Sequence, residues 1–217
     1  QVYKSSWAQR VRFGGDVRLR YQADLFDEEN AENIIDVSPI DLGNLSGSDL
    51  ITNTTNDRHR FRYRVRLAMK AKIIDPRQDF KNIGNVEAGI RLSSGSEDNP
   101  ISTNDTLGDY QNKDSIVLDR GYLRWSYQPL EPVWGGKIPE VSISGGRIAN
   151  PWFYSNLVWD SDLNFEGIAI SGQTDTLTSN PWRGFLTLGA FSIQEEEWSQ
   201  QDKWLFAGQV GVERAKP

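Results

Sequence analysis

The feature of this sequence that most constrains its fold is a strict alternation of apolar and cationic residues between Arg60 and Ile74. Seven apolar residues occupy the odd positions from Phe61 to Ile73, and six of the seven interleaved even positions are Arg or Lys. Successive side chains of a β-strand point to opposite faces, whereas a helix would spread these cations around its circumference. The segment therefore predicts a long strand with one apolar face and one charged face.

The same period of two recurs along the chain and predicts an all-β protein. In the first such segment, Val17, Leu19 and Tyr21 alternate with Arg18 and Arg20. Eight strands are expected, at residues 10–24, 58–74, 84–95, 115–128, 139–148, 166–174, 182–195 and 203–214. No segment has the pattern of an amphipathic helix and no linker divides the chain, so residues 1–217 are expected to form a single unit.

The connections between these strands differ in length. Long polar stretches at 25–57 and 96–114 alternate with shorter ones at 75–83 and 129–138. Strands of about ten residues, with long loops at one end and short turns at the other, are typical of outer-membrane barrels. The expected fold is an antiparallel transmembrane β-barrel, with the apolar face against lipid and the polar face toward the lumen.

Composition limits the function more than the fold. The chain carries 24 Lys+Arg against 30 Asp+Glu, and this net charge of −6 argues against nucleic-acid binding. It has no Cys and one His, which excludes disulfides, thiolate chemistry and multi-histidine metal sites. Hydrophobic residues make up 37%, and no stretch approaches the roughly 20 apolar residues of a membrane-spanning helix. A barrel can be this polar because only half of each strand faces lipid.

Cationic side chains on the polar faces of the predicted strands form the candidate pore lining. Four arginines at strict alternation are unusual for a solvated face, because like charges side by side repel one another. Across a water-filled lumen they can instead reach acidic partners. The expected basic wall consists of Arg18, Arg20, Arg60, Arg62, Arg64, Arg66, Arg91, Arg120 and Arg124.

The connection at residues 149–165 is more apolar and aromatic than the other long loops. A loop rich in Trp, Phe and Leu is expected to fold against the lumen wall as a constriction rather than extend into water. Its acids Asp160 and Asp162, with the adjacent Glu166, would then face the arginine walls of the first, second and fourth strands. Opposed rows of charge would create a transverse field that orients and selects solutes.

Aromatic residues at strand ends predict the girdles that flank the lipid-facing band of a barrel. Each candidate lies near the beginning or the end of its predicted strand. The candidates are Trp125, Tyr127, Trp182 and Trp204. Packing within an ordinary hydrophobic core is the alternative for these rings.

The most specific motif of the chain is the run Trp-Asp-Ser-Asp-Leu-Asn-Phe-Glu-Gly from Trp159 to Gly167. Further motifs are Gly15–Tyr21, Asp57–Arg64, Arg120–Trp125 and Gly146–Trp152. In these segments the chain resembles the putative porin family of Gram-negative outer membranes. The resemblance implies a non-enzymatic passive diffusion channel for small hydrophilic solutes or ions, without a cofactor. It also implies the outer membrane, with lipid and lipopolysaccharide around the barrel; the candidate assembly is a homotrimer.

The resemblance further implies a barrel of about sixteen strands, roughly twice the number expected here, whose final strand ends in an aromatic residue. This chain ends Glu213-Arg214-Ala215-Lys216-Pro217. We therefore expect it to be the N-terminal part of a longer barrel. A complete barrel of about eight strands would be filled by side chains, and the arginines would then form a packed plug.

Three other interpretations stay open. Asp160, Asp162 and Asn164 have the spacing that begins a Ca²⁺ loop, although Phe165 stands where a turn-making Gly is expected. Asp160, Asp162 and Glu166 could serve a soluble carbohydrate-binding or carbohydrate-active β-protein, because carboxylates about 5–10 Å apart can cleave glycosides. The third interpretation is a structural or adhesive outer-membrane barrel.

Overall fold

The computed structural model describes residues 9–27, 29–30, 34–35, 51–75, 83–108, 110–128, 139–155, 157–174, 181–195 and 202–214. Eight long strands carry the fold: β1 (Val11–Asp24), β4 (Arg58–Ile74), β5 (Asn85–Ser94), β7 (Ile116–Tyr127), β8 (Pro139–Ala149), β9 (Asn164–Thr174), β10 (Trp182–Gln194) and β11 (Lys203–Arg214). The short strands β2 (Ile34–Ile35), β3 (Ile51–Thr52) and β6 (Asp105–Thr106) lie in the connections. Within these ranges, no helix is long and apolar enough to cross a membrane.

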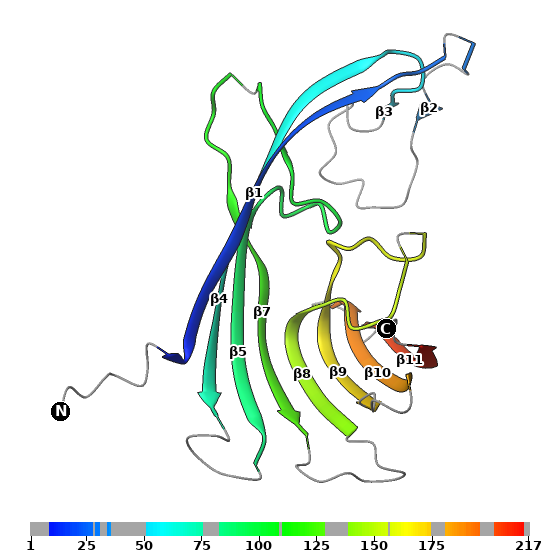
Figure 1. The fold of residues 1–217 in the computed structure, drawn as a ribbon. Coiled ribbons are helices and arrows are strands. Elements are labelled where there is room, and N and C mark those ends of the chain that lie inside the picture. The colour runs from blue at the N-terminus through cyan, green and yellow to red at the C-terminus, as the bar shows by residue number, and fades with distance from the viewer. Residues whose placement is uncertain are drawn as a thin grey trace, which may run out of the picture.

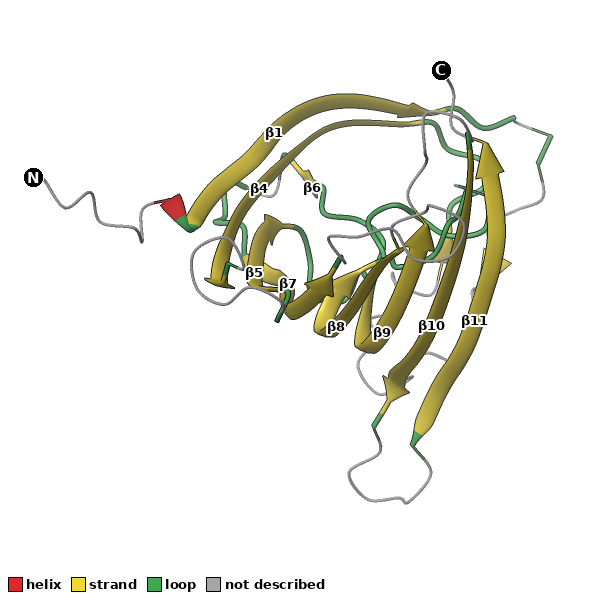
Figure 2. Cartoon of the chain, turned by 60° about the horizontal axis from the view of Figure 1, so that its bottom comes forward, coloured by secondary structure: helices red, strands yellow, loops and turns green. Residues whose placement is uncertain are grey.

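The eight long strands form one antiparallel sheet in the order β1-β4-β5-β7-β8-β9-β10-β11. Each long strand thus pairs with the next long strand along the chain, while β6 adds a short pairing to β4 and β2 pairs with β3. In the described part of the chain, β1 and β11 do not pair, so the sheet is curved and open (Figure 2). The predicted all-β antiparallel fold is confirmed, and its closure into a barrel stays a prediction.

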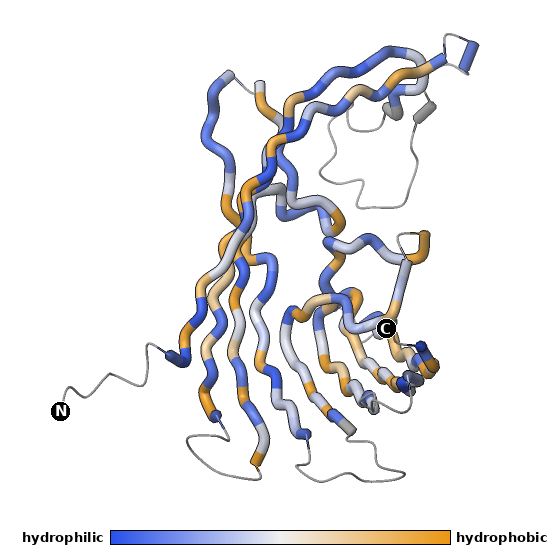
Figure 3. The backbone as a smooth tube through the Cα atoms, viewed as in Figure 1, coloured by the Kyte–Doolittle hydropathy of each residue, from blue (hydrophilic) through white to orange (hydrophobic). Residues whose placement is uncertain are grey.

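The register of the strands keeps two kinds of side chain apart. β1 and β4 pair so that Val17 lies opposite Val65 and Arg18 lies opposite Arg64. Apolar side chains therefore fill one side of the sheet, the apolar face, and the arginines fill the other, the polar face; Figure 3 shows the alternation along each strand. Many large side chains on the apolar face are exposed, and the exposed fraction reaches 80% at Phe13, Leu19 and Val210.

The antiparallel strands finish at two opposite ends of the sheet (Figure 1). β4, β7 and β9 finish at one end, and β1, β5, β8 and β10 finish at the other. The three strands that precede the long connections, β1, β5 and β8, thus all finish at the same end. Long connections that leave one end of the sheet are typical of the predicted barrel.

A small hydrophobic core forms on the polar face of β8, β9 and β10. Its buried members are Ile148, Trp152, Phe165, Ala169 and Phe191. The Trp152 ring meets Phe165 and Phe191 edge-on, with ring centroids 6.4 and 6.0 Å apart. Trp152 comes from the connection after β8, so this core attaches that connection to the sheet.

Two glycines that lie directly opposite each other, one on β8 and one on β9, allow both strands to bend at the same point. Gly146 pairs with Gly167, and their φ angles are +111° and +149°. Residues with a Cβ rarely adopt such angles. A Cβ on Gly167 would in addition collide with the carbonyl oxygen of Ala190 on β10. Glycine at position 167 is therefore required by both its backbone angle and its neighbour.

β7 and β8 separate within the sheet (Figure 1). β7 pairs with β5 along nearly its whole length, but with β8 only over residues 121–127. Beyond this seam, side chains replace the missing ladder: Arg147 Nε donates to the Asp119 carbonyl oxygen at 3.0 Å, and Asn164 Nδ2 donates to the same oxygen at 3.1 Å. We call this region the β7–β8 fork.

Candidate functional site

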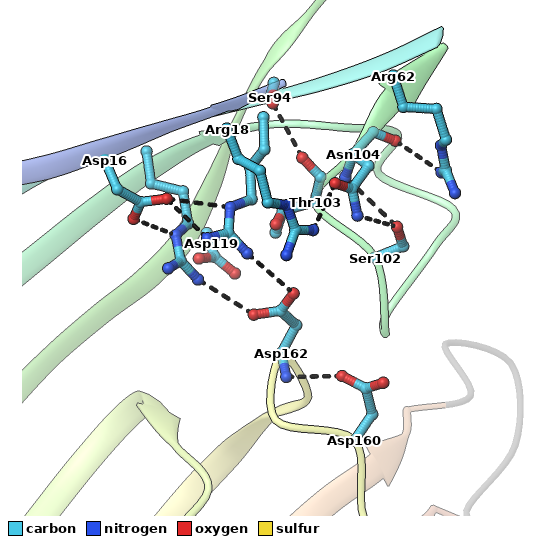
Figure 4. A network of polar contacts seen from close by, with 12 residues as sticks. Asp16, Arg18, Arg62, Ser94, Ser102, Thr103, Asn104, Asp119, Asp160 and Asp162 are labelled. Carbon is cyan, nitrogen blue, oxygen red and sulfur yellow. Dashed lines mark hydrogen bonds and ion pairs between the residues drawn. The ribbon is translucent and has the colours of Figure 1, made fainter. Parts of the chain in front are cut away.

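The polar faces of β1 and β4 place four of the predicted arginines directly opposite one another. Arg18 lies opposite Arg64, and Arg20 lies opposite Arg62. Like charges in directly opposed positions repel, so the arrangement requires partners that offset this repulsion. The partners come from β1 itself and from two connections that fold onto the polar face (Figure 4).

Asp16 of β1 holds Arg64 and Arg66 from within the sheet. Its Oδ1 accepts hydrogen bonds from Arg64 Nε and Nη2 at 3.1 and 2.7 Å, and its Oδ2 accepts one from Arg66 Nε at 2.7 Å. The two arginine side chains keep only 12% and 19% of their surface exposed. Asp16 was not among the predicted site residues, although its place in the alternation puts it on the polar face.

Asp162 reaches the same two arginines from the connection between β8 and β9. Arg66 Nη1 donates to Asp162 Oδ1 at 3.1 Å, and Arg64 Nη1 lies 3.7 Å from Asp162 Oδ2. The strands β5, β7 and β8 lie between β4 and β9 in the sheet, and neighbouring strands are about 4.8 Å apart. The connection therefore crosses the inner side of the curved sheet.

Hydrogen bonds and aromatic packing hold this connection on the polar face. Trp152 is buried, and Asn150 Oδ1 accepts a hydrogen bond from its N–H at 3.0 Å. Phe153 exchanges two hydrogen bonds with Gln209 of β11: its N–H donates to Oε1 at 2.8 Å, and its carbonyl oxygen accepts from Nε2 at 2.7 Å. The aromatic residues of the connection thus pack against the sheet, and its role as a constriction stays a prediction.

The other two predicted acids have different partners. Asp160 Oδ1 accepts a hydrogen bond from the Asp162 N–H at 2.7 Å, which fixes the turn before β9. Glu166 has a side chain that is 57% exposed, and it pairs with Arg147 of β8. Of the three acids, the described structure brings Asp162 alone into contact with arginines of the predicted basic wall.

The connection after β5 supplies polar partners to two further arginines. Arg18 Nη2 donates to Asn104 Oδ1 at 2.6 Å, and Arg62 Nη2 donates to the Asn104 carbonyl oxygen at 3.2 Å. Arg62 Nη1 also donates to Gln22 on β1 at 3.2 Å. No sequence pattern marked Asn104, because it lies in a long polar loop whose path depends on tertiary contacts.

The arginines at the two ends of the predicted wall differ in their surroundings. Arg60 pairs with Asp24 on β1 at 2.5 Å. Arg124 is 45% exposed and lies 3.8 Å from Glu140 of β8. Arg20 is exposed, and no other described residue forms a hydrogen bond or ion pair with it. Pairing is therefore uneven along the wall: Arg60 pairs closely with Asp24, whereas Arg20 and Arg124 are exposed.

Arg91 and Arg120 form the part of the predicted wall that lies beside the β7–β8 fork. They stand directly opposite each other on β5 and β7. Arg91 pairs with Asp119, whose side chain is 5% exposed. Arg120 Nε donates to Asn164 Oδ1 at 2.8 Å, and Asn164 Nδ2 donates to Asp119 Oδ1 at 2.6 Å. Asp119 lies where the β5–β7 register shifts, so simple alternation could not place it.

The four predicted girdle aromatics lie on the apolar face near strand ends. Trp125 and Tyr127 stack at the end of β7 with ring centroids 6.2 Å apart, and Trp125 Nε1 donates to the Ile83 carbonyl oxygen at 2.7 Å. Trp182 begins β10 at the same end of the sheet, and Trp204 lies near the start of β11 at the other end. None of the four belongs to the buried core of the described residues. Contact with a membrane interface stays a prediction.

The candidate Ca²⁺ ligands do not converge on one point. The Asn164 side chain bonds to Asp119 and Arg120, whereas Asp162 faces arginines of β4. In the described ranges, no group of three or more His, Cys, Asp or Glu could hold a metal ion. The carboxylates considered for a carbohydrate-active site also diverge, since Asp162 and Glu166 pair with arginines on different strands.

Two adjoining cavities follow the polar face beneath the connection. One, of about 340 Å³, is lined by residues of β4, β5, β7, β8 and β9, and the other, of about 200 Å³, extends to β10 and β11. Both are lined by Arg124, Ser142, Pro151 and Ser171. Three arginines of the predicted wall line the larger of the two: Arg91, Arg120 and Arg124.

Comparison with known proteins places these features in a family. The chain matches the family model described as Putative porin over residues 4–216. No curated protein and no solved structure matches it. The match covers nearly the whole chain and confirms the resemblance that the run from Trp159 to Gly167 indicated. The chain belongs to the putative porin family.

Proposed function

We propose that this protein is a passive diffusion channel of the Gram-negative outer membrane and has no enzymatic activity. Membership of the porin family supports the class of function. The exposed apolar face suits contact with lipid acyl chains. Antiparallel strands can cross a bilayer when their backbone groups are paired within the sheet. The polar face, with its arginines, then lines a water-filled lumen.

The observation that carries this proposal is the pairing of Arg64 and Arg66 with Asp162 across the inner side of the sheet. A cationic row that only faces bulk water needs no carboxylate from a connection three strands away. Here the connection occupies the space in front of the row and sets negative charge against positive charge. Small hydrophilic solutes and ions that pass beside it experience a transverse field.

The two open edges of the sheet set the proposed architecture. Among the described residues, the outer edges of β1 and β11 have no neighbouring strand, and unpaired backbone groups are costly in lipid. We infer that further strands pair with both edges in a barrel of about sixteen strands. Lipid and lipopolysaccharide surround the apolar face in this arrangement, and a homotrimer is the proposed assembly, which chemical cross-linking in native membranes would test.

Two measurements test the proposal. The protein should leave the membrane only with detergent and should run on gels as a heat-modifiable band; recovery in the soluble fraction without detergent would favour the carbohydrate-active alternative. In planar bilayers, the purified protein should produce ohmic current steps. Protein that inserts well but stays silent would favour a structural or adhesive barrel.

A further inference from the structure

The larger of the two adjoining cavities has charged lining residues of one sign. It measures about 340 Å³ and lies under the start of the connection after β8. Its charged lining residues, among those that the structure describes, are Lys70, Arg91, Arg120 and Arg124, and no Asp or Glu lines it. Small side chains such as Ala68, Ser144 and Ala169 complete the lining and leave the space open.

The acids that reach these cations do so from the margins of the cavity. Arg91 pairs with Asp119, Arg124 lies 3.8 Å from Glu140, and Lys70 lies 3.9 Å from Glu87. Arg120 differs from all three. Its hydrogen bond within the described residues runs from Nε to the neutral Asn164 side chain, and Arg91 stands directly opposite it. Arg120 therefore contributes a positive charge that no carboxylate of the described residues offsets by direct contact.

Two side-chain donors of the lining are buried and lack a hydrogen-bond partner among the described residues. They are Arg91 Nη2 and Asn150 Nδ2. The orientation of the Asn150 amide is set by its Oδ1, which accepts from the Trp152 N–H at 3.0 Å. Buried donors of this kind need an acceptor, and an anion or a water supplies one.

We propose that this cavity binds a small oxyanion such as phosphate, with Arg120 as its central cation. The inference rests on the proposed channel function and names the solute class that the channel retains. Arginine suits such a ligand because its planar guanidinium donates two parallel hydrogen bonds to an oxyanion. A volume of about 340 Å³ accommodates the ion together with several waters, each of which takes about 30 Å³ in the liquid. Ala68 lines this cavity and lies two residues from Arg66 on the same face of β4, so the site adjoins the pairing of Arg66 with Asp162.

Inorganic phosphate is the probe, and two readouts on the whole protein separate this site from the channel. In planar bilayers with chloride salts, added phosphate should reduce the single-channel conductance along a saturating curve. In lipid-free detergent micelles, the ³¹P resonance of phosphate should broaden on binding. The micelle measurement excludes lipid phosphate groups as the source of the signal.

Arg120→Gln should weaken both effects by roughly tenfold, because one charge-assisted set of hydrogen bonds is lost. Arg12→Gln is the matched control, since Arg12 is an exposed cation on the polar face of β1 that does not line the cavity. Heat modifiability shows whether Arg120→Gln folds. If it does not fold, Arg124→Gln replaces it as the test variant, because Arg124 is an exposed residue of the lining. Arg124→Gln should also weaken both effects more than Arg12→Gln does.

The possible results distinguish failure of the oxyanion site from failure of the proposed channel. Current steps without any phosphate effect in either readout would overturn the oxyanion site and leave the channel intact. Equal losses in Arg120→Gln and Arg12→Gln would also overturn it, because they indicate a general field rather than a site. Line broadening that Arg120→Gln abolishes, in a protein that gives no current steps, would support the site and contradict the channel.

Discussion

The Asp162 carboxylate contacts the Arg66 guanidinium at 3.1 Å, although the strands β5, β7 and β8 lie between β4 and the strand that follows Asp162. Asp16 contacts the same guanidinium from within the sheet at 2.7 Å. Arg66 therefore joins the wall to the connection that crosses it. Substitutions at this junction, and at the contacts that hold it in place, should therefore change both selectivity and stability.

Replacement of Asp162 by Asn should shift ion selectivity toward anions. The change removes the negative charge that faces Arg64 and Arg66, so the local field along the proposed passage becomes more positive. The measurement is the reversal potential in planar bilayers under a salt gradient.

Two matched changes show whether the effect belongs to this pairing. Asp160→Asn and Glu166→Gln alter the same charge, but Asp160 contacts the Asp162 N–H and Glu166 pairs with Arg147. Both should shift the reversal potential less than Asp162→Asn. If all three shift it equally, Asp162 has no special place in the passage.

Replacement of Asp119 by Asn should destabilise the sheet beside the β7–β8 fork. Asp119 and Arg91 have side chains that are only 5% and 12% exposed, and Asn leaves the arginine charge buried without its counterion. Loss of one partner of a buried ion pair costs about 3–5 kcal/mol. Urea unfolding in detergent measures the change, with the exposed Glu97→Gln as the control; equal midpoints for the two variants would contradict this account.

Replacement of Trp152 by Ala should release the connection after β8 from the sheet. The indole packs on Phe165 and Phe191, and large aromatic-to-Ala changes in a core cost about 3–5 kcal/mol. We expect a lower thermal transition in detergent and noisier, larger current steps. Leu157→Ala, in the same connection but 97% exposed, should leave both unchanged.

Replacement of Gly167 by Ala should prevent β9 from passing β10 in its present position. The φ angle of +149° is unfavourable for Ala, and the new Cβ meets the carbonyl oxygen of Ala190. Backbone strain of this kind costs about 1–3 kcal/mol before the collision is added. Gly14→Ala on β1 is the control, since a Cβ there meets nothing within 4 Å. Equal thermal stability of the two variants would show that β9 adapts.

The strands were predictable from sequence because period-two patterns report which side of a sheet each residue occupies. The run Arg60–Ile74 predicted β4, and β9 differs only in beginning at Asn164 rather than at residue 166. Antiparallel pairing of consecutive strands followed from the same pattern. The curvature of the sheet and the fork were not predictable, because they depend on Gly167, Asp119 and the packing of connections.

The candidate site was predictable in its cations and only partly in its acids. Alternation placed Arg64 and Arg66 on the polar face, and the aromatic character of the connection suggested that Asp162 faces them. The pairing of Glu166 with Arg147 could not be read from sequence, because it depends on the β8–β9 register. The partner Asp16 was overlooked because it lies in the middle of a row of arginines.

The β7–β8 fork makes one seam inside the sheet weaker than the ladders on either side of it. β5 and β7, like β8 and β9, are joined by backbone ladders along nearly their whole length, whereas β7 and β8 share a ladder only at residues 121–127. Beyond that ladder, β7 is joined to β8 and β9 through the hydrogen bonds of Arg147 and Asn164 to the Asp119 carbonyl oxygen. We therefore expect amide protons of β7 beyond the seam to exchange for deuterium before those within it. Such a wall would yield sideways, between β7 and β8, before either strand parts from its other neighbour.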